Sequence, residues 1–343
     1  MFRGDSIIEY FLIRITALIL IGIYPFQAIA EENNLPYYTL LDSNTGHVIA
    51  ENNPDKLWNP ASLTKLMTAY VVFSFLEQKK ITLETPITIS KNASEQPPSN
   101  STFKKGSILT LDNALKLLIV KSANDIAVAI AESLCNTEEE FVKHMNDSAQ
   151  TLGLLRTKFM NSHGVVQNGH YTTARDMTIL SWRIKTHFSQ YAHYFQIKGL
   201  KIKNKKYPNT NWAIGIFLGA DGMKTGFTCA SGFNIVASAS QGNRSLITVV
   251  LGALDRDSRN QISEKLLSAG FDKKKYRNKI NYIIKKYDKK PFSIKVPDIS
   301  EKVCTPKNEI TNFNTQIKET KDKEKYFTNF EIITLFKKSN RIT

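Results

Sequence analysis

The segment from Asn59 to Leu76 restricts the fold more than any other part of this chain. Its apolar side chains recur at steps of three and four residues, the period of one buried helix face; they are Leu63, Leu66, Met67, Tyr70, Val71, Phe73 and Leu76. Asn59 is a suitable N-cap, and Pro60 suits the first helical position. The sequence therefore predicts a buried or half-buried helix that begins close to Ser62.

Two polar residues at this helix start have the spacing of a nucleophile and its base. A serine hydroxyl is a poor nucleophile at neutral pH unless a base lies within hydrogen-bond distance. Residues i and i+3 of a helix face the same side, so Lys65 is predicted to lie beside Ser62. Lysine acts as a base only when burial or a nearby positive charge lowers its pKa, and Lys224 is the candidate for that charge. The N–H groups at the helix start can stabilise an oxyanion.

Ser-x-x-Lys is a weak pattern by itself, because this chain contains it twice. The second copy, Ser101 to Lys104, lies in a polar stretch without helical periodicity and is predicted to be a surface loop. The first copy is selected by two further patterns that follow it in order. Ser122-Ala123-Asn124 comes 60 residues later, between two predicted helices, and Lys224-Thr225-Gly226 a further 102 residues on, on a predicted strand. The candidate catalytic residues are Ser62, Lys65, Ser122, Asn124 and Lys224.

The remaining elements predict the fold class. Residues 37–41 and 47–50 are β-like runs on either side of a turn-rich stretch, which indicates a hairpin. Residues 63–152 are mostly helical in their periodicity. The region after Asn211 predicts three antiparallel strands with tight turns, and then a helix. The predicted fold is α/β of the α+β type, with an antiparallel sheet flanked by helices and a mostly helical subdomain. The two sets of strands can join in one sheet.

The first 30 residues have the features of a secretory signal. Residues 15–23 are almost wholly apolar, and Ala28-Ile29-Ala30 before Glu31 has the form of a cleavage site. The apolar run is shorter than the roughly 20 residues that a bilayer-spanning helix needs. Cleavage after Ala30 and retention as an anchor both remain open. In either case the rest of the chain is expected outside the cytoplasm.

Positive charge is concentrated near the C-terminus. The formal net charge is +15, and residues 272–343 contain 19 Lys and Arg against 9 Asp and Glu. We therefore expect a signal at 1–30, a mildly basic domain at 31–272 and a basic tail at 273–343. The body is not basic enough to favour nucleic acid, whereas anionic lipid or wall polymer would attract the tail. Residues 326–335 suggest a short interfacial helix, with a disordered tail as the alternative.

The three cysteines, Cys135, Cys229 and Cys304, are an odd number in an exported chain whose domain is large enough to need no covalent staples. No disulfide framework is expected, and Cys229 is predicted to be a small buried residue near the site. No Cys/His cluster has the spacing of a zinc site, so no metal and no cofactor are expected.

Longer stretches around the three patterns carry a resemblance to a known family. They are Asn-Pro-Ala-Ser-Leu-Thr-Lys-Leu-Met-Thr at 59–68, Asn-Ser-His-Gly at 161–164, Thr-Ala-Arg-Asp-Met at 173–177 and Asp-Gly-Met-Lys-Thr-Gly at 221–226. From about Tyr37 to Phe271 the chain resembles the low-molecular-mass penicillin-binding proteins that are serine-type D-alanyl-D-alanine carboxypeptidases. The resemblance implies a β-lactamase/transpeptidase-like fold, an acyl-enzyme mechanism and β-lactams as covalent inhibitors.

The resemblance also assigns roles. Ser62 would attack the carbonyl between the two D-alanines of a peptidoglycan stem peptide, and Lys65 would take its proton. Ser122 and Lys224 would pass a proton to the leaving D-alanine, and Asn124 would hold the peptide amide. The substrate-binding residues would be Lys224, Thr225, Gly226, Phe227 and Arg259. Among these, the N–H of Phe227 would complete an oxyanion hole with that of Ser62. Thr225 and Arg259 would hold the terminal carboxylate, and Arg256 remains open as the alternative arginine.

Three rival functions are compared with this reading. A D,D-endopeptidase that cuts D-Ala cross-links has the same catalytic set and remains the alternative. A class A β-lactamase needs a carboxylate that activates the deacylating water, but residues 155–159 contain no acid. A non-catalytic wall-binding protein predicts a missing nucleophile or base, and both are present. The expected location is the periplasm, with peripheral contact to the outer face of the cytoplasmic membrane.

Two polar residues of the family-like stretches are given structural roles. His163, in a His-Gly loop, is expected to stabilise that loop. Asp176 is expected to cap a helix or to pair with a cation rather than to act as a catalytic acid.

Overall fold

The computed structural model describes residues 36–272, 282–283, 294–304 and 331–335. The predicted signal at 1–30 and most of the predicted basic tail lie outside these residues. In the part of the chain that is described, no helix combines the length and the apolar character needed to cross a bilayer.

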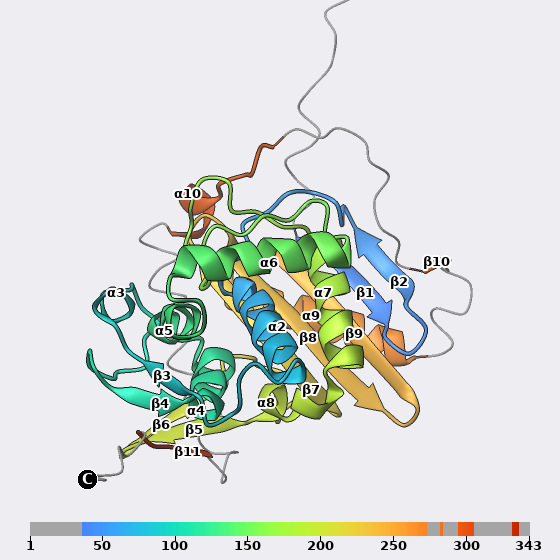
Figure 1. The fold of residues 1–343 in the computed structure, drawn as a ribbon. Helices are drawn as coiled ribbons and strands as arrows, with labels where there is room; N and C mark the ends of the chain where they lie inside the picture. Colours follow the sequence, from blue (N-terminus) through green and yellow to red (C-terminus); the bar gives the residue numbers. More distant parts are fainter. Residues whose placement is uncertain (1–35, 273–281, 284–293, 305–330, 336–343) are drawn as a thin grey trace, which may run out of the picture. The chain divides into compact units, whose positions relative to one another are not determined.

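A six-stranded sheet lies at the centre of the described chain (Figure 1). Its strands follow the order β10 (Tyr282–Ile283), β2 (His47–Asn52), β1 (Tyr37–Asp42), β9 (Arg244–Ala253), β8 (Gly232–Gln241) and β7 (Ala220–Thr228). Every neighbouring pair is antiparallel. The N-terminal hairpin and the C-terminal meander therefore join in one sheet through the β1–β9 pair, and the predicted α+β fold is confirmed.

The two faces of the sheet pack against different helices, because successive side chains of a strand point in opposite directions. Leu41 and Val249 belong to one apolar cluster, together with residues of α2 (Thr64–Glu77) and α7 (Ala174–His187). Their neighbours Leu40 and Val250 belong to a second cluster with Leu267 of α9 (Arg256–Phe271). The sheet is thus covered by α9 on one face and by the helical part of the molecule on the other.

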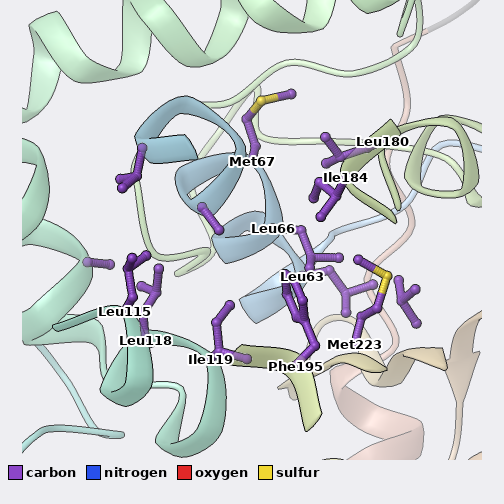
Figure 2. Packing of buried hydrophobic residues seen from close by; sticks show 14 of the residues in the cluster. Leu63, Leu66, Met67, Leu115, Leu118, Ile119, Leu180, Ile184, Phe195 and Met223 are labelled. Atoms are coloured by element: carbon purple, nitrogen blue, oxygen red, sulfur yellow. The ribbon is translucent and has the colours of Figure 1, made fainter. Parts of the chain in front are cut away.

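Helix α2 forms where the sequence predicted a buried or half-buried helix, and it lies in the core of the helical part. The first half of α2 is buried on all sides, which is typical of a core helix rather than a surface one. In Figure 2 the labelled side chains of Leu66, Leu118, Ile184 and Met223, which come from four separate elements, belong to one buried cluster. Each large apolar side chain buried in this way contributes about 1.5–3 kcal/mol to stability.

The other elements of this part are short or lie around α2. They are β3 (Pro86–Thr88), α3 (Lys91–Ser94), β4 (Ile108–Thr110), α4 (Leu111–Lys116), a π-helical turn η2 (Leu117–Lys121), α5 (Asn124–Cys135), α6 (Glu138–Leu152), η3 (Ser189–Tyr191) and α8 (His193–Gln196). Strands β3 and β4 form a small sheet that helical periodicity did not predict.

Three described pieces of the predicted tail contact the body. β10 pairs with β2, and β11 (Glu331–Ile333) runs parallel to β5 (Gly199–Ile202), which in turn pairs with β6 (Lys205–Pro208). The interfacial helix expected over 326–335 is therefore wrong at 331–333, where the chain is a strand, and residues 326–330 lie outside the described part.

The third piece, 294–304, contains α10 (Ser300–Val303) and forms a disulfide with the body between Cys304 and Cys229. The expectation of no disulfide framework did not anticipate this bond, because the fold brings together two cysteines that are 75 residues apart in the sequence. Ile299 donates its N–H to the carbonyl of Ala230, and the side chains of Ile299 and Val303 are buried in the core. Cys135 is buried and has a free thiol.

Candidate active site

Ser62 lies in a 3-10 turn, η1 (Ala61–Leu63), that leads directly into α2. The helix start differs from the prediction. Asn59 does not cap the turn; its carbonyl accepts a hydrogen bond from the side chain of Asn234 instead. Ala61 has a φ of 48°, a left-handed conformation that is unfavourable for a residue with a Cβ. The turn that presents Ser62 is therefore held by its neighbours rather than by a cap.

Lys65 is fully buried one turn after Ser62. Its Nζ lies 2.9 Å from Ser62 Oγ, 2.7 Å from Asn124 Oδ1 and 2.7 Å from the carbonyl oxygen of His163. Burial lowers the pKa of Lys65 well below its ordinary value, and the positive charge of Lys224 lowers it further. A lysine whose pKa is lowered and that lies beside a hydroxyl can activate a serine. The structure brings Lys65 and Ser62 within hydrogen-bond distance, as the sequence predicted.

Ser122 and Asn124 come from the break between η2 and α5. Ser122 has a left-handed φ of 61° and lines the site cavity. Asn124 accepts from Lys65 through Oδ1 and donates through Nδ2 to the carbonyl oxygens of Pro97 and Pro98, at 2.8 and 3.2 Å. Both polar atoms of Asn124 are thus engaged within the protein, so its contacts are those of a residue that holds Lys65 and the 97–98 loop.

The third pattern lies on β7, which runs alongside η1. A Cβ on Gly226 would lie 3.1 Å from the backbone nitrogen of Ser62 and 2.9 Å from the carbonyl oxygen of Pro60. Only a glycine allows the strand to approach the turn that contains Ser62 this closely. The residue after this contact, Phe227, lines the same cavity as Ser62.

Lys224 lies behind the cavity wall and has no exposed surface. Its Nζ donates to the carbonyl oxygen of Thr225 at 2.9 Å. Burial and the nearby charge of Arg259 lower the pKa of Lys224 to about 7. The contact of Lys224 with Thr225 differs from the expected proton path, in which Lys224 acts together with Ser122.

A cavity of roughly 290 Å³ connects the three patterns. Ser62, Ser122 and Asn124 line it on one side, and Thr225, Gly226 and Phe227 line it on the other. Both candidate arginines also line it, so each is placed to meet an anionic ligand. Arg259 is 2% exposed and donates from its guanidinium to Asn260 Oδ1, whereas Arg256 lies over the ring of Phe233.

The rejected copy of Ser-x-x-Lys is not a second site. Ser101 is fully buried, so the prediction of a surface position is wrong for this residue. Its hydroxyl and its N–H both donate to the carboxylate of Asp125, while Lys104 is exposed. A buried carboxylate thus holds this loop, a contact that the polar sequence does not reveal.

Sequence patterns missed one group in the site, the backbone carbonyl of His163. Motifs identify side chains, and every residue has a carbonyl, so only the fold shows that this one accepts from Lys65. Asp176 is buried and accepts from the N–H of Arg156 and the hydroxyl of Thr157, which fits a structural role; burial raises its pKa to about 7. Among the described residues, no group of three or more His, Cys, Asp and Glu is arranged to hold a metal ion.

Comparisons with known proteins show what the chain is similar to in sequence and in fold. A family model described as D-alanyl-D-alanine carboxypeptidase, Peptidase S11, matches residues 28–255. The D-alanyl-D-alanine carboxypeptidase DacC of Escherichia coli is 37% identical over 243 residues, which cover 68% of this chain and 60% of that protein. The matched region spans about three fifths of the length of DacC and DacA of Escherichia coli and of DacF of Bacillus subtilis.

Two solved structures are similar in fold. Penicillin-binding protein 5 from Haemophilus influenzae has a TM-score of 0.66 and 35% identity, over 68% of this chain and 70% of that one. Penicillin-binding protein D2 from Listeria monocytogenes, in its ampicillin-bound form, has a TM-score of 0.63 and 26% identity, over 69% of this chain and 97% of that one.

Proposed function

Because the chain belongs to the D-alanyl-D-alanine carboxypeptidase family of serine peptidases, we propose that it removes the terminal D-alanine from peptidoglycan stem pentapeptides through an acyl-enzyme. The observation that carries this proposal is the contact of a buried lysine, Lys65, with Ser62 Oγ at 2.9 Å. A lysine whose pKa is lowered by burial can serve as the base that a serine nucleophile needs.

In the acylation step, Ser62 Oγ attacks the carbonyl carbon between the two D-alanines while Lys65 takes the hydroxyl proton. The negative charge that develops on the carbonyl oxygen is stabilised by the backbone N–H groups of Ser62 and Phe227. This pairing is supported by the close approach of β7 to the nucleophile turn at Gly226. The bond to the leaving D-alanine then breaks, and its nitrogen receives a proton by way of Ser122, which lines the cavity.

We assign three further residues to binding and charge. Arg259, with Thr225, holds the terminal carboxylate of the substrate, and its charge also lowers the pKa of Lys224. Lys224 contributes positive charge behind the cavity wall. Asn124 orients the amine of Lys65 rather than holding the substrate amide, since both of its polar atoms are engaged within the protein. Water then hydrolyses the acyl-enzyme and releases the shortened peptide.

We propose that β-lactams acylate Ser62 and that the resulting acyl-enzyme is hydrolysed slowly. The ampicillin-bound form of the Listeria relative supports this proposal. Among the residues that the structure describes, no acidic side chain lines the cavity, whereas a class A β-lactamase places one there to activate the deacylating water.

The test is labelling followed by mass analysis. Fluorescent penicillin should label the wild-type protein at Ser62, identified by peptide mapping, and the variant Ser62→Ala should not be labelled. Incubation with a stem pentapeptide should yield the tetrapeptide and free D-alanine. Labelling of Ser62→Ala would contradict the assignment of Ser62 as the nucleophile. Cleavage of cross-linked dimers without loss of the terminal D-alanine would favour the endopeptidase function.

We further propose that the protein is exported, by a signal within residues 1–30, to the periplasm, where it contacts the membrane peripherally. The Cys229–Cys304 disulfide supports an oxidising compartment.

The sheet of β5, β6 and β11 exposes Lys201 beside Ile332, which is 66% exposed, and cross-strand neighbours share one sheet face. Basic and apolar groups on one face fit an anionic membrane surface. Deletion of residues 318–343 should release the protein from membranes, and unchanged fractionation would reject the contact.

A further inference from the structure

The amine of Lys65 must be oriented as well as neutral. A neutral amine has two N–H groups and one lone pair, and only the lone pair can take the proton of Ser62. Two carbonyl oxygens, Asn124 Oδ1 and His163 O, lie 2.7 Å from Nζ, closer than the Ser62 hydroxyl at 2.9 Å. When both N–H groups are donated to these oxygens, the lone pair faces Ser62. The carbonyl of His163 is therefore one of two groups that set the direction of proton transfer.

No side-chain substitution can remove this carbonyl, so its position depends on what holds the turn at 161–164. Ser162, which is fully buried, donates its N–H and its hydroxyl to the same oxygen of Glu138, at 2.8 and 2.6 Å. Glu138 is the first residue of α6, and its side chain is 17% exposed.

The opposite side of the turn faces α2. The carbonyl of Ser162 accepts from Thr68 Oγ1 at 2.6 Å, and the carbonyl of His163 accepts from Lys65 Nζ. Thr68 and Lys65 are three residues apart, so they lie on the same side of α2. The two donors of Ser162 face Glu138 on α6 while the two carbonyls face α2, and the turn is thus clamped between the two helices.

The imidazole ring of His163 does not take over the role of the hydrogen bonds between Ser162 and Glu138. Its Nδ1 accepts from the N–H of Val165 at 3.2 Å, which leaves the ring proton on Nε2, 3.9 Å from Glu138. Burial lowers the pKa of His163 to about 3, so the ring is neutral and forms no ion pair with Glu138. The contact of Glu138 with the turn is carried by Ser162.

We propose that Glu138 and Ser162 are positioning residues for acylation: together they fix the His163 carbonyl against Lys65 and thereby direct the lone pair of the amine at Ser62. This inference rests on the proposed role of Ser62 as the acylated nucleophile. Glu138 does not line the cavity, and it acts through its hydrogen bonds to Ser162 in the turn.

Four variants test the proposal. Glu138→Ala removes the acceptor of both bonds, whereas Glu138→Gln keeps an acceptor oxygen without the charge. Ser162→Ala removes the hydroxyl bond and keeps the N–H. Glu139→Ala is the matched control, because Glu139 is exposed on the same helical turn. Each is compared with the wild type at a temperature at which circular dichroism shows it folded, by measuring the acylation rate constant and the non-covalent dissociation constant of fluorescent penicillin.

Glu138→Ala should lower the acylation rate constant about 10- to 100-fold, as expected when a catalytic group is misplaced by about 1 Å, with the dissociation constant unchanged. Ser162→Ala should show a smaller loss, and Glu138→Gln and Glu139→Ala should stay close to the wild type. Normal acylation by Glu138→Ala would overturn the proposal. So would a Glu138→Gln variant as slow as Glu138→Ala, because charge and not the hydrogen bonds would then matter. If Glu138→Ala does not fold, Ser162→Ala is measured in its place, and normal acylation by Ser162→Ala would then overturn the proposal.

A crystal structure of Glu138→Ala, or of Ser162→Ala in its place, separates this proposal from the proposed function. The distance from His163 O to Lys65 Nζ should lengthen beyond hydrogen-bond range, and a distance that stays at 2.7 Å would overturn the inference. Failure of the wild-type protein to become labelled at Ser62 would instead overturn the proposed function, and the crystallographic distance would still decide the role of the clamp.

Discussion

At the scale of single residues, the site depends on two lysines that have no exposed surface, Lys65 and Lys224. A buried ammonium loses its hydration, so burial favours the neutral amine and lowers the pKa of both groups. The two lysines also repel each other as cations. The charge of Lys224 therefore lowers the pKa of Lys65 further and favours the neutral form that the proposed mechanism requires.

Lys65→Arg should abolish acylation, with a loss of at least about 1,000-fold, while the protein keeps its fold. A guanidinium remains protonated at any accessible pH, so it cannot take the proton of Ser62. The measurements are penicillin labelling and thermal unfolding by circular dichroism. Labelling at the wild-type rate would contradict the assignment of Lys65 as the base.

Lys224→Gln should move the acidic limb of the pH–rate profile for acylation to higher pH. The charge of Lys224 lowers the pKa of Lys65, so its removal lets that pKa rise, and the base becomes neutral only at higher pH. The rate constant for β-lactam acylation is measured from about pH 5 to pH 9, the range in which perturbed groups of this kind titrate. A limb that stays in place, or that moves to lower pH, would show that Lys224 does not act on Lys65 through charge.

At the scale of elements, the site is assembled by close backbone approaches. β7 passes η1 at Gly226, and the 161–164 turn passes it from the other side at Gly164, which has a φ of 94°. A Cβ on Gly164 would lie 1.9 Å from the carbonyl oxygen of Ala61, the residue before the nucleophile. These glycines let two separate segments pack closely against the η1 turn that contains Ser62.

Gly164→Ala should unfold or displace this turn and should reduce acylation strongly. Gly106→Ala is the matched control, because Gly106 also has a positive φ, 82°, but a Cβ there would meet nothing within 4 Å. The control should cost only the conformational penalty of about 1–2 kcal/mol. Thermal unfolding and the acylation rate are measured for both variants. Equal effects in the two would show that the contact with Ala61 has no consequence.

Elements with a clear period were predictable, because burial of one face imposes that period. The α2 core helix, the α9 helix and the meander of β7, β8 and β9 all follow such patterns. The helix start was not predictable, since a 3-10 turn with a left-handed Ala61 replaces the expected cap at Asn59. The order of the motifs predicted that Ser62, Lys65, Ser122, Asn124 and Lys224 lie close together. The position of the His163 carbonyl depends on how two loops pack, and a backbone carbonyl cannot be predicted from the residue type.

At the scale of the whole molecule, the catalytic body includes a segment that the sequence assigned to the tail. Residues 294–304 pack on the β7–β8 turn, two residues beyond Phe227, and bury Ile299 and Val303. Cys229 and Cys304 join the two parts covalently. The edge of the cavity near Phe227 is therefore stabilised from outside the region matched by the family model, which ends at residue 255.

The double variant Cys229→Ser/Cys304→Ser should unfold at a lower temperature than the wild type. The bond spans 75 residues, and a cross-link of that length restricts the unfolded chain by up to about 4.5 kcal/mol. Calorimetry gives the change in melting temperature, and Cys135→Ser serves as the control, because its thiol is free. A double variant as stable as the wild type would show that packing of Ile299 and Val303 alone holds the segment.

The same bond closes residues 229–304 into a ring. A protease that cuts one peptide bond within this ring makes two fragments that stay attached to each other. The fragment with Ser62 carries any bound penicillin, and the other fragment carries Cys304. On a gel without reductant, the nicked protein migrates as one labelled species. Reductant separates it into a labelled N-terminal piece and an unlabelled C-terminal piece. Clipping between the body and its C-terminal region therefore leaves that region attached until a reductant opens the ring.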